Sequence, residues 1–308
     1  MTDPLSSNPP KLGFFLLVTV TLLWGVNWPV MKIAVEALGP WTFRGLMVPV
    51  GGLVLLTIAR LTSQPIVVPS GHWRLLLAAA LFNVAGWHVL SAFGVSHMAS
   101  GQAALIAFTM PLWAALIGVA FLGEPMTARR AAALGLGLGG IAVLMPHVFT
   151  RLDEQILGIA FMLATAIAWA IGVVIQKHVR WQMPVIAVAG WQLLIGGLPI
   201  ALVAALVEDI DFARVPPAAW AAVAFNLIGP LCFCTWAWYK VIDLFPVRVS
   251  SISVLLAPAI GVVTAGLALG EPMGWREAAA VILISSALAL ELILRRPDPI
   301  PTIKGTES

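Results

Sequence analysis

The sequence predicts an all-α integral membrane protein with ten transmembrane helices, arranged as two inverted repeats of five helices each. The first observation is composition: 60% of the 308 residues are hydrophobic, and 10% are Asp, Glu, Lys or Arg. The second is a series of long windows without those charged residues, because about 20 apolar residues form a helix that crosses a bilayer. The third is the pentapeptide Leu-Gly-Glu-Pro-Met, which occurs at residues 122–126 and again at 269–273.

The charge-free windows give the helices in chain order. They cover residues 12–31, 45–59, 75–123, 131–150, 155–176, 181–207, 215–239, 249–270 and 278–290. The third window is too long for one crossing, so we expect it to fold back near residues 94–100. The two short windows, 45–59 and 278–290, can be extended by their flanking residues. Arg44 and Glu291 would then lie near helix ends, from which long polar side chains reach the membrane interface. The count is therefore ten helices, with little chain left for a soluble domain.

The distribution of Lys and Arg predicts the orientation. With the N-terminus placed in the cytoplasm, 12 of the 17 Lys and Arg fall on the cytoplasmic side and 5 on the other. This excess favours both termini in the cytoplasm, with residues 1–11 and 295–308 as short tails. The first window is too long for the apolar region of a signal peptide and no A-x-A-like cleavage site follows it, so we expect it to remain as a helix.

The repeated pentapeptide belongs to a wider duplication. A spacing of 147 residues also relates Pro111 to Pro258, Arg129 to Arg276, and Trp73 to Trp220, and a spacing of 145 relates Trp24 to Trp169 and Lys32 to Lys177. The repeats then span residues 12–150 and 151–294. Because each holds an odd number of helices, the two halves enter the membrane from opposite sides. Inverted repeats are typical of secondary transporters, although channels and enzymes can also be duplicated.

The pentapeptide has a local chemistry of its own. Pro125 and Pro272 cannot continue a helix interior, so each ends one helix and suits the first turn of the next. Glu124 and Glu271 then lie near the N-terminus of that next helix, where the helix dipole favours negative charge. The alternative is a gate, in which an ion-paired Glu at each mouth holds one side shut.

Several of these features resemble those of a known family. The early motif Trp24-Gly25-Val26-Asn27-Trp28, and Leu-Gly-Glu at the end of the fourth helix of each half, resemble the drug/metabolite transporter superfamily. Within it the chain is most similar to the EamA-type exporters of bacteria, among them amino-acid exporters, over about residues 12–294. The resemblance implies a central cavity lined by helices one, three, four, six, eight and nine, efflux by alternating access, and a place in the bacterial inner membrane.

Polar and aromatic residues inside the helices are the candidates for the cavity wall, since uncompensated polar groups are costly in a bilayer. In helix four, Gln102, Ile106, Thr109 and Trp113 follow a helical spacing, and Pro111 interrupts the helix and frees a backbone carbonyl. Pro258 is expected to break helix nine in the same way. The predicted cavity residues are Trp24, Asn27, Asn83, Trp87, His88, Gln102, Thr109, Trp113, Trp169, Gln176, Asn226, Trp236 and Ser253. The alternative for the polar members is hydrogen bonding between packed helices.

Charged residue types are absent from the predicted membrane midplane, and their absence disfavours some classes of transporter. The absence of Asp and Glu there disfavours a dedicated antiporter of cationic drugs and protons. The absence of Lys and Arg disfavours phosphorylated sugars as substrates, because phosphate binding requires fixed positive charges. An uncharged cavity of Trp, Asn, Gln and Thr suits a small zwitterion with an apolar side chain. We therefore predict export of amino acids, aromatic and other apolar ones favoured, by facilitated diffusion and by a monomer.

The sequence also allows other substrates and another energy source. The cargo could belong to another class, such as nucleosides, sugar phosphates or drugs, and His88 is the best candidate for proton exchange. A membrane enzyme would need a nucleophile–base pair or a metal cluster, and we find neither, so we expect no enzymatic activity, no cofactor and no metal. Gly135, Gly137 and Gly140 match G-x-G-x-x-G but follow no strand, so they indicate helix packing and not nucleotide binding.

Overall fold

The computed structural model describes residues 11–145 and 154–293, and its regular structure in these ranges is helical throughout. Eight helical segments there are long and apolar enough to cross a membrane. Two shorter ones complete the bundle: α7 (Ala128–Leu144), and α13 (Trp275–Leu288) continuing into η6 (Ala289–Ile293). The 17 residues of α7 are at the lower limit for a transmembrane helix. The predicted all-α membrane fold is confirmed, with eight candidate spans among the described residues, and the count of ten stays a prediction.

The first half begins with α1 (Lys11–Leu38) and α2 (Pro40–Leu61). Its third segment consists of η1 (Ser70–His72), α3 (Trp73–Ala79), the π-helical η2 (Ala80–Gly86) and α4 (Trp87–His97), and its fourth consists of α5 (Ser100–Ala107) and α6 (Met110–Phe121). The predicted fold-back near 94–100 is confirmed, since α4 ends at His97 and α5 begins at Ser100. The predicted tails, apart from Lys11, and the end of the charge-free window at residues 131–150 lie outside the described residues.

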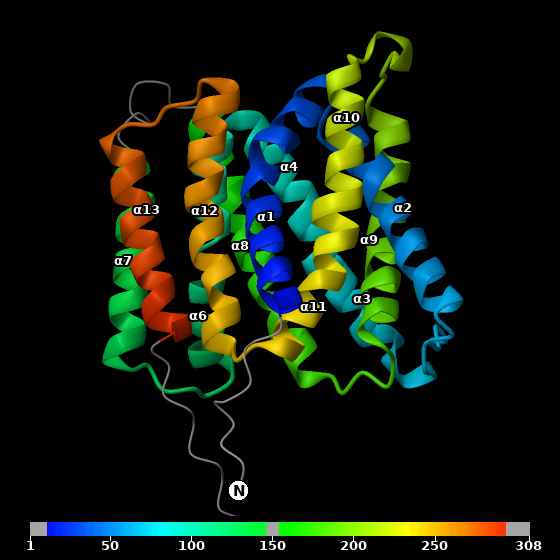
Figure 1. Ribbon diagram of the computed structural model, residues 1–308, viewed down its shortest axis with the longest axis horizontal. Coiled ribbons are helices and arrows are strands. Elements are labelled where there is room, and N and C mark those ends of the chain that lie inside the picture. Colours follow the sequence, from blue (N-terminus) through cyan, green and yellow to red (C-terminus); the bar gives the residue numbers. More distant parts are fainter. Residues whose placement is uncertain (1–10, 146–153, 294–308) are drawn as a thin grey trace, which may run out of the picture.

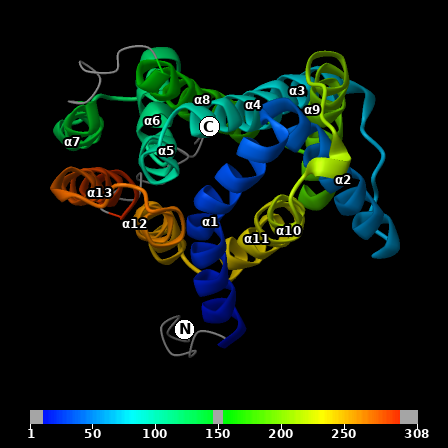
Figure 2. The same cartoon turned by 90° about the horizontal axis from the view of Figure 1, so that it is seen from above.

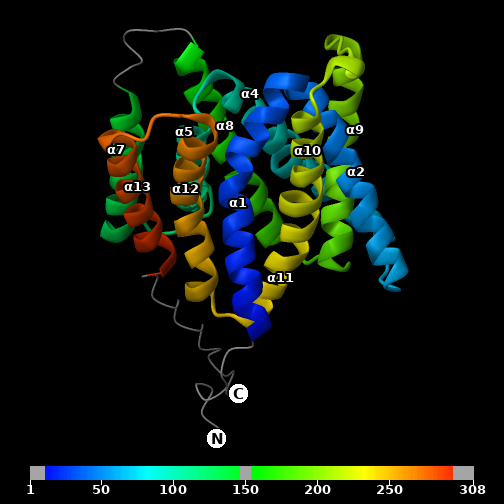
Figure 3. The same ribbon diagram turned by 45° about the horizontal axis from the view of Figure 1, so that its top comes forward.

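The second half repeats this order with α8 (Glu154–His178) and α9 (Val185–Val207). Then follow η4 (Phe212–Arg214), α10 (Pro217–Asn226), the π-helical η5 (Leu227–Phe233), α11 (Cys234–Leu244) and α12 (Val247–Leu269). In Figure 1, α3 lies at the lower end and α4 above it, whereas α10 lies at the upper end and α11 below it, an order that Figure 3 repeats for α10 and α11. The third segments of the two halves therefore run in opposite directions.

Local backbone features recur at the spacing of the pentapeptide. The π-helical segments η2 and η5 begin 147 residues apart, and so do α4 and α11. Gly123 and Gly270 have φ angles of 68° and 67°, a left-handed conformation that glycine adopts without steric cost at the end of a helix. The backbone N–H groups of Glu124 and Glu271 then donate to Gly118 and Ala265. Each pentapeptide thus ends a helix in the same way.

The two prolines predicted to break helices behave differently. The α5–α6 segment is interrupted at Phe108 and Thr109, and Pro111 occupies the first turn of α6. By contrast, α12 runs without interruption from Val247 to Leu269, with Pro258 inside it. The break expected at Pro258 is therefore absent, because a single missing backbone hydrogen bond is tolerated where neighbouring helices hold the segment in place.

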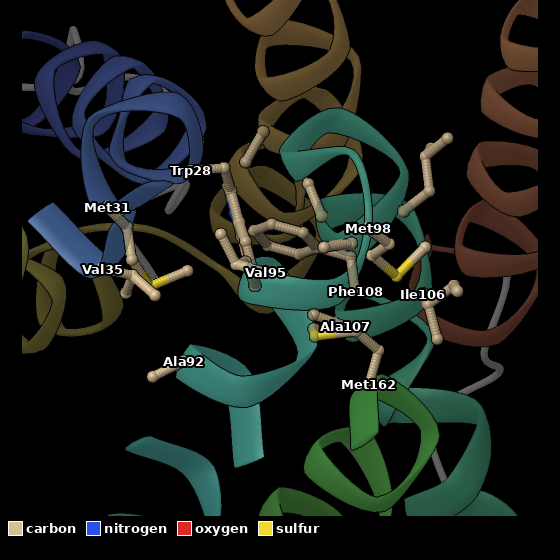
Figure 4. Packing of buried hydrophobic residues seen from close by; sticks show 14 of the residues in the cluster. Trp28, Met31, Val35, Ala92, Val95, Met98, Ile106, Ala107, Phe108 and Met162 are labelled. Atoms are coloured by element: carbon tan, nitrogen blue, oxygen red, sulfur yellow. The ribbon is translucent and has the colours of Figure 1, made fainter. Parts of the chain in front are cut away.

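Helix α1 lies at the centre of the bundle, between α12 and the α10–α11 segment (Figure 2). On one side, α2 packs closely against α9 through glycines: a Cβ on Gly52 would lie 2.6 Å from the Leu194 nitrogen, and one on Gly197 would lie 2.6 Å from the Pro49 nitrogen. Small residues at such crossings let helix backbones approach each other. The buried core continues along α1 to the α5–α6 break, where Trp28 meets Phe108 (Figure 4) with ring centroids 6.3 Å apart.

Candidate ligand cavity

A cavity of about 250 Å³ lies between the two halves. Its wall is formed by α1, α2, η2, α4, the α5–α6 break, α8, α9, α10, η5 and α11. It extends from Arg44 and Ser91, near one end of the bundle, to Gln176, in the last turn of α8, and Tyr239, in the middle of α11. The volume is close to the lower end of the range for small-molecule sites, roughly 300–1,000 Å³.

Most of the wall consists of positions that the duplication relates. Eight pairs of lining residues share the two repeat spacings: Trp24 and Trp169, Met31 and Gln176, Arg44 and Ala189, and Met47 and Gln192 at 145, and Asn83 and Pro230, Val84 and Leu231, His88 and Thr235, and Ser91 and Trp238 at 147. Equivalent segments of both halves therefore face the same space. The chemistry differs within most pairs, so the cavity has unlike halves and can orient a ligand.

Eight of the residues predicted from the sequence lie on this wall: Trp24, Asn27, Asn83, Trp87, His88, Trp169, Gln176 and Asn226. The aromatic ones contact each other. Trp87 packs against Trp169 in a tilted arrangement with ring centroids 4.9 Å apart, and it meets Trp28 edge-on at 6.5 Å. A second pair, Trp24 and Trp238, has centroids 5.0 Å apart. The cavity therefore offers large, stiff apolar surfaces that suit a ring or a branched side chain.

The polar members of the wall hold unsatisfied atoms. Within the described residues, Asn27 Oδ1, both side-chain polar atoms of Asn83, His88 Nδ1 and Asn226 Oδ1 are buried without a hydrogen-bond partner. The amide of Asn226 is oriented by its Nδ2, which donates to the Ala222 carbonyl at 2.9 Å. Buried polar groups in proteins are nearly always paired, and each orphan calls for an explanation. Four orphaned side chains around one cavity point to a polar ligand.

The other five predicted residues lie elsewhere. Gln102 Nε2 donates to Glu277 on α13 at 2.9 Å, and Ser253 accepts from Thr21 on α1 at 2.7 Å. Trp113 Nε1 donates to Thr109 at 3.1 Å. The stripe expected along helix four is divided because the break at Phe108 and Thr109 turns α6 relative to α5.

Trp236 is the fifth, with 41% of its surface exposed. The π-helical η5 precedes it, and the wider turns of a π-helix shift the face on which later side chains lie. Its ring contacts Phe233, 5.9 Å away, and not the cavity.

Arg44 is the main residue that the sequence analysis missed. It lines the cavity and is 3% exposed, so the expectation of an uncharged cavity is wrong, and so is the placement of Arg44 at a membrane interface. The reason is the helix boundary: α2 begins at Pro40, which places Arg44 more than a turn inside the helix. Gly39-Pro40 was the signal that could have found it, because proline favours the first helical turn. Phe108, Gln192 and Trp238 also line the cavity and were not predicted.

The two pentapeptide glutamates make different contacts. Glu271 accepts hydrogen bonds from the backbone N–H of Ser100 (2.8 Å), from its hydroxyl (3.0 Å) and from the N–H of Gly101 (2.9 Å), and it lies 3.5 Å from Lys32 Nζ. It therefore caps α5 and not the helix that follows it, α13, whose N-terminus is capped by Glu277. Glu124 instead pairs with Arg130 at 2.5 Å. We call these ends of the bundle the Glu271 face and the Glu124 face.

The comparisons with known proteins agree on one class. The model of the EamA-like transporter family matches residues 11–145 and 156–293. The probable amino-acid metabolite efflux pump of Salmonella typhimurium is 23% identical over 90% of this chain and 94% of its own length. The uncharacterized transporter YoaV of Bacillus subtilis is 24% identical over 83% and 88%. A solved crystal structure with 22% identity aligns over 92% of this chain and 96% of its own, with a TM-score of 0.62, and shares the fold.

Proposed function

Because the chain belongs to the EamA-like transporter family, we propose that it exports amino acids with aromatic or other apolar side chains, or closely related metabolites. The observation that carries this proposal is the cavity, where tryptophan rings and orphaned polar atoms surround the same space. The rings match an apolar side chain, whereas Asn27, Asn83 and Asn226 offer oxygen atoms to an ammonium group. The similarity to the probable amino-acid metabolite efflux pump of Salmonella typhimurium supports this substrate class.

We propose alternating access as the mechanism, with the pentapeptide glutamates as its latches. At the Glu271 face, the carboxylate joins α12 to the N-terminus of α5, and these two helices pack together. By the 147-residue relation, the equivalent contact would join Glu124 to the first turn of α12 at residues 247–248. In the described contacts Glu124 is held by Arg130. Exchange between the two latches would open one face as it closes the other.

The remaining features of the proposal follow from the family and the charges. The protein lies in the bacterial inner membrane with both termini in the cytoplasm, which makes the Glu271 face the outer one. Both halves are present in one chain, so a monomer suffices. Transport is facilitative, driven by the gradient of the amino acid itself, because the described wall of the cavity contains no Asp or Glu; proton exchange through His88, which lines the wall, is the alternative.

Transport into proteoliposomes tests the proposal. Purified protein should mediate exchange of labelled phenylalanine, tryptophan and leucine, faster than of labelled lysine or aspartate, with or without a pH difference across the membrane. Protein-free liposomes and liposomes with the Trp87→Ala variant are the controls. If amino acids of every kind cross no faster than in protein-free liposomes, while nucleosides or sugar phosphates do cross, the substrate class is wrong.

A further inference from the structure

We propose that Arg44 is the anchor for a carboxylate of the substrate, so that the cavity selects molecules with this group and fixes their orientation. The proposal rests on the proposed function for the identity of the cargo, but carboxylate binding is measurable on its own. Arg44 is a strong candidate because it is buried, charged, and on the wall of the cavity.

The contacts of Arg44 position its guanidinium without neutralising it. Nε donates to the His88 carbonyl at 3.0 Å, and one terminal nitrogen donates to the Ser91 hydroxyl at 2.9 Å. The other contacts are the thioether sulfurs of Met31 at 2.6 Å and Met47 at 3.6 Å, and the Phe43 ring, whose centroid lies 4.7 Å from Cζ. Thioethers are weak acceptors, and none of these five partners carries a charge. Two oxygens therefore hold the side chain in place, while the N–H groups that face sulfur are free to exchange for a better acceptor.

Within the described residues, Arg44 has no carboxylate partner. The two carboxylate oxygens of Glu208 accept from the backbone N–H groups of Trp41 and Thr42 at the start of α2. Among residues 11–145 and 154–293, the arginine ion pairs involve Arg130 and Arg214 and not Arg44. A buried charge without a partner is costly, and proteins normally compensate it with an opposite charge. The open space beside Arg44 is the place where that charge can enter.

The geometry favours an oxyanion at this end of the cavity. The planar guanidinium fork matches the two oxygens of a carboxylate, so two parallel hydrogen bonds can form between them. The equivalent position in the second half is Ala189, which also lines the cavity, so the positive charge stands on one side only. A zwitterion can then place its carboxylate at Arg44 and its ammonium group against the amide oxygens and ring faces of the remaining wall.

Arginine also binds phosphate, so the test must separate the two oxyanions. Binding to purified protein in detergent would be measured by competition against labelled phenylalanine, or by the change in tryptophan fluorescence. The probes are phenylalanine, 3-phenylpropionate (carboxylate alone), phenethylamine (ammonium alone) and phenyl phosphate. We expect 3-phenylpropionate to bind about tenfold to a hundredfold more tightly than phenethylamine, the range for hydrogen bonds to charged groups. Equal affinities for these two, or preferred binding of phenyl phosphate, would overturn the proposal.

Variants of Arg44 add a second test. Arg44→Met should remove the preference for 3-phenylpropionate over phenethylamine, and Arg44→Lys should retain part of it, because lysine keeps the charge but not the fork. Arg60→Met, which removes an exposed arginine of the same helix outside the cavity, is the matched control and should keep the wild-type preference. If Arg44→Met does not fold, the analogue series on the wild-type protein still decides the question.

The two proposals fail in different ways. Carboxylate selectivity that depends on Arg44, without amino-acid flux in proteoliposomes, would remove the transport claim and leave the anchor. Flux of amino acids with unchanged selectivity in Arg44→Met would remove the anchor and leave the transport claim.

Discussion

Replacing Glu271 by Gln should open the face of the bundle that this residue closes. The carboxylate accepts three hydrogen bonds from Ser100 and Gly101 and lies 3.5 Å from Lys32 Nζ, with 10% of its own side chain exposed. A charged acceptor makes a hydrogen bond roughly twice as strong as a neutral one, worth about 0.5–1 kcal/mol more for each bond. Allowing for one amide oxygen that still accepts, the closed arrangement should lose about 2 kcal/mol, a roughly 30-fold change in its population.

Distances between spin labels measure this shift. With Cys232 and Cys234 replaced by Ser, labels at Ser96 and Met273 would report the Glu271 face, and labels at Phe121 and Leu244 the Glu124 face. In Glu271→Gln, the distribution of distances between the labels at the Glu271 face should broaden to longer values. The distribution at the Glu124 face should broaden to shorter values.

Glu36→Gln is the matched control for this prediction. Glu36 also contacts Lys32, at 3.9 Å, but it is 61% exposed, and an exposed ion pair contributes at most about 1 kcal/mol. Its distributions should stay close to those of the parent protein. Unchanged distributions in Glu271→Gln, or equal changes in both variants, would refute the role of Glu271 as a latch.

Three further predictions concern the wall and its support. Asn83→Ala should lower the affinity for amino acids about tenfold. It should change the free energy of unfolding by less than about 1 kcal/mol, because both polar atoms of the Asn83 side chain lack a protein partner. Binding and chemical denaturation in detergent measure the two effects. Trp87→Ala should weaken binding of phenylalanine about tenfold and of alanine less, whereas Trp236→Ala, outside the cavity, should change neither affinity. Gly172→Ala should lower the free energy of unfolding by about 1–3 kcal/mol, because the new methyl group would overlap the Asn83 carboxamide. Gly135 has open space around it, so Gly135→Ala should stabilise α7 slightly in the same denaturation experiment.

The fold was predictable because the bilayer imposes one simple requirement on composition. A segment that crosses it must be apolar over about 20 residues, so charge-free windows located the spans and the charged residue Glu124 located the end of one. Side-chain direction within a helix was harder, because it depends on every turn between two residues. The π-helical turns before Trp236 and the break before Trp113 each rotate the following residues, and neither changes the composition on which the prediction rests.

The duplication contains more information about the cavity than any single helix does. Trp24 and Trp169 were paired by sequence spacing alone, and both lie on the wall. The same spacing applied to Gln176 leads to Met31, and applied to Gln192 it leads to Met47, the two thioethers that contact Arg44. The two halves of an inverted repeat are related by an axis, so equivalent positions of both halves lie around the same central space. When a polar residue of one half lines the cavity, the equivalent residue of the other half is therefore a candidate for the cavity wall, even when it is apolar. Arg44 and Ala189 are such a pair, and their difference is the reason a substrate would enter this cavity in one orientation.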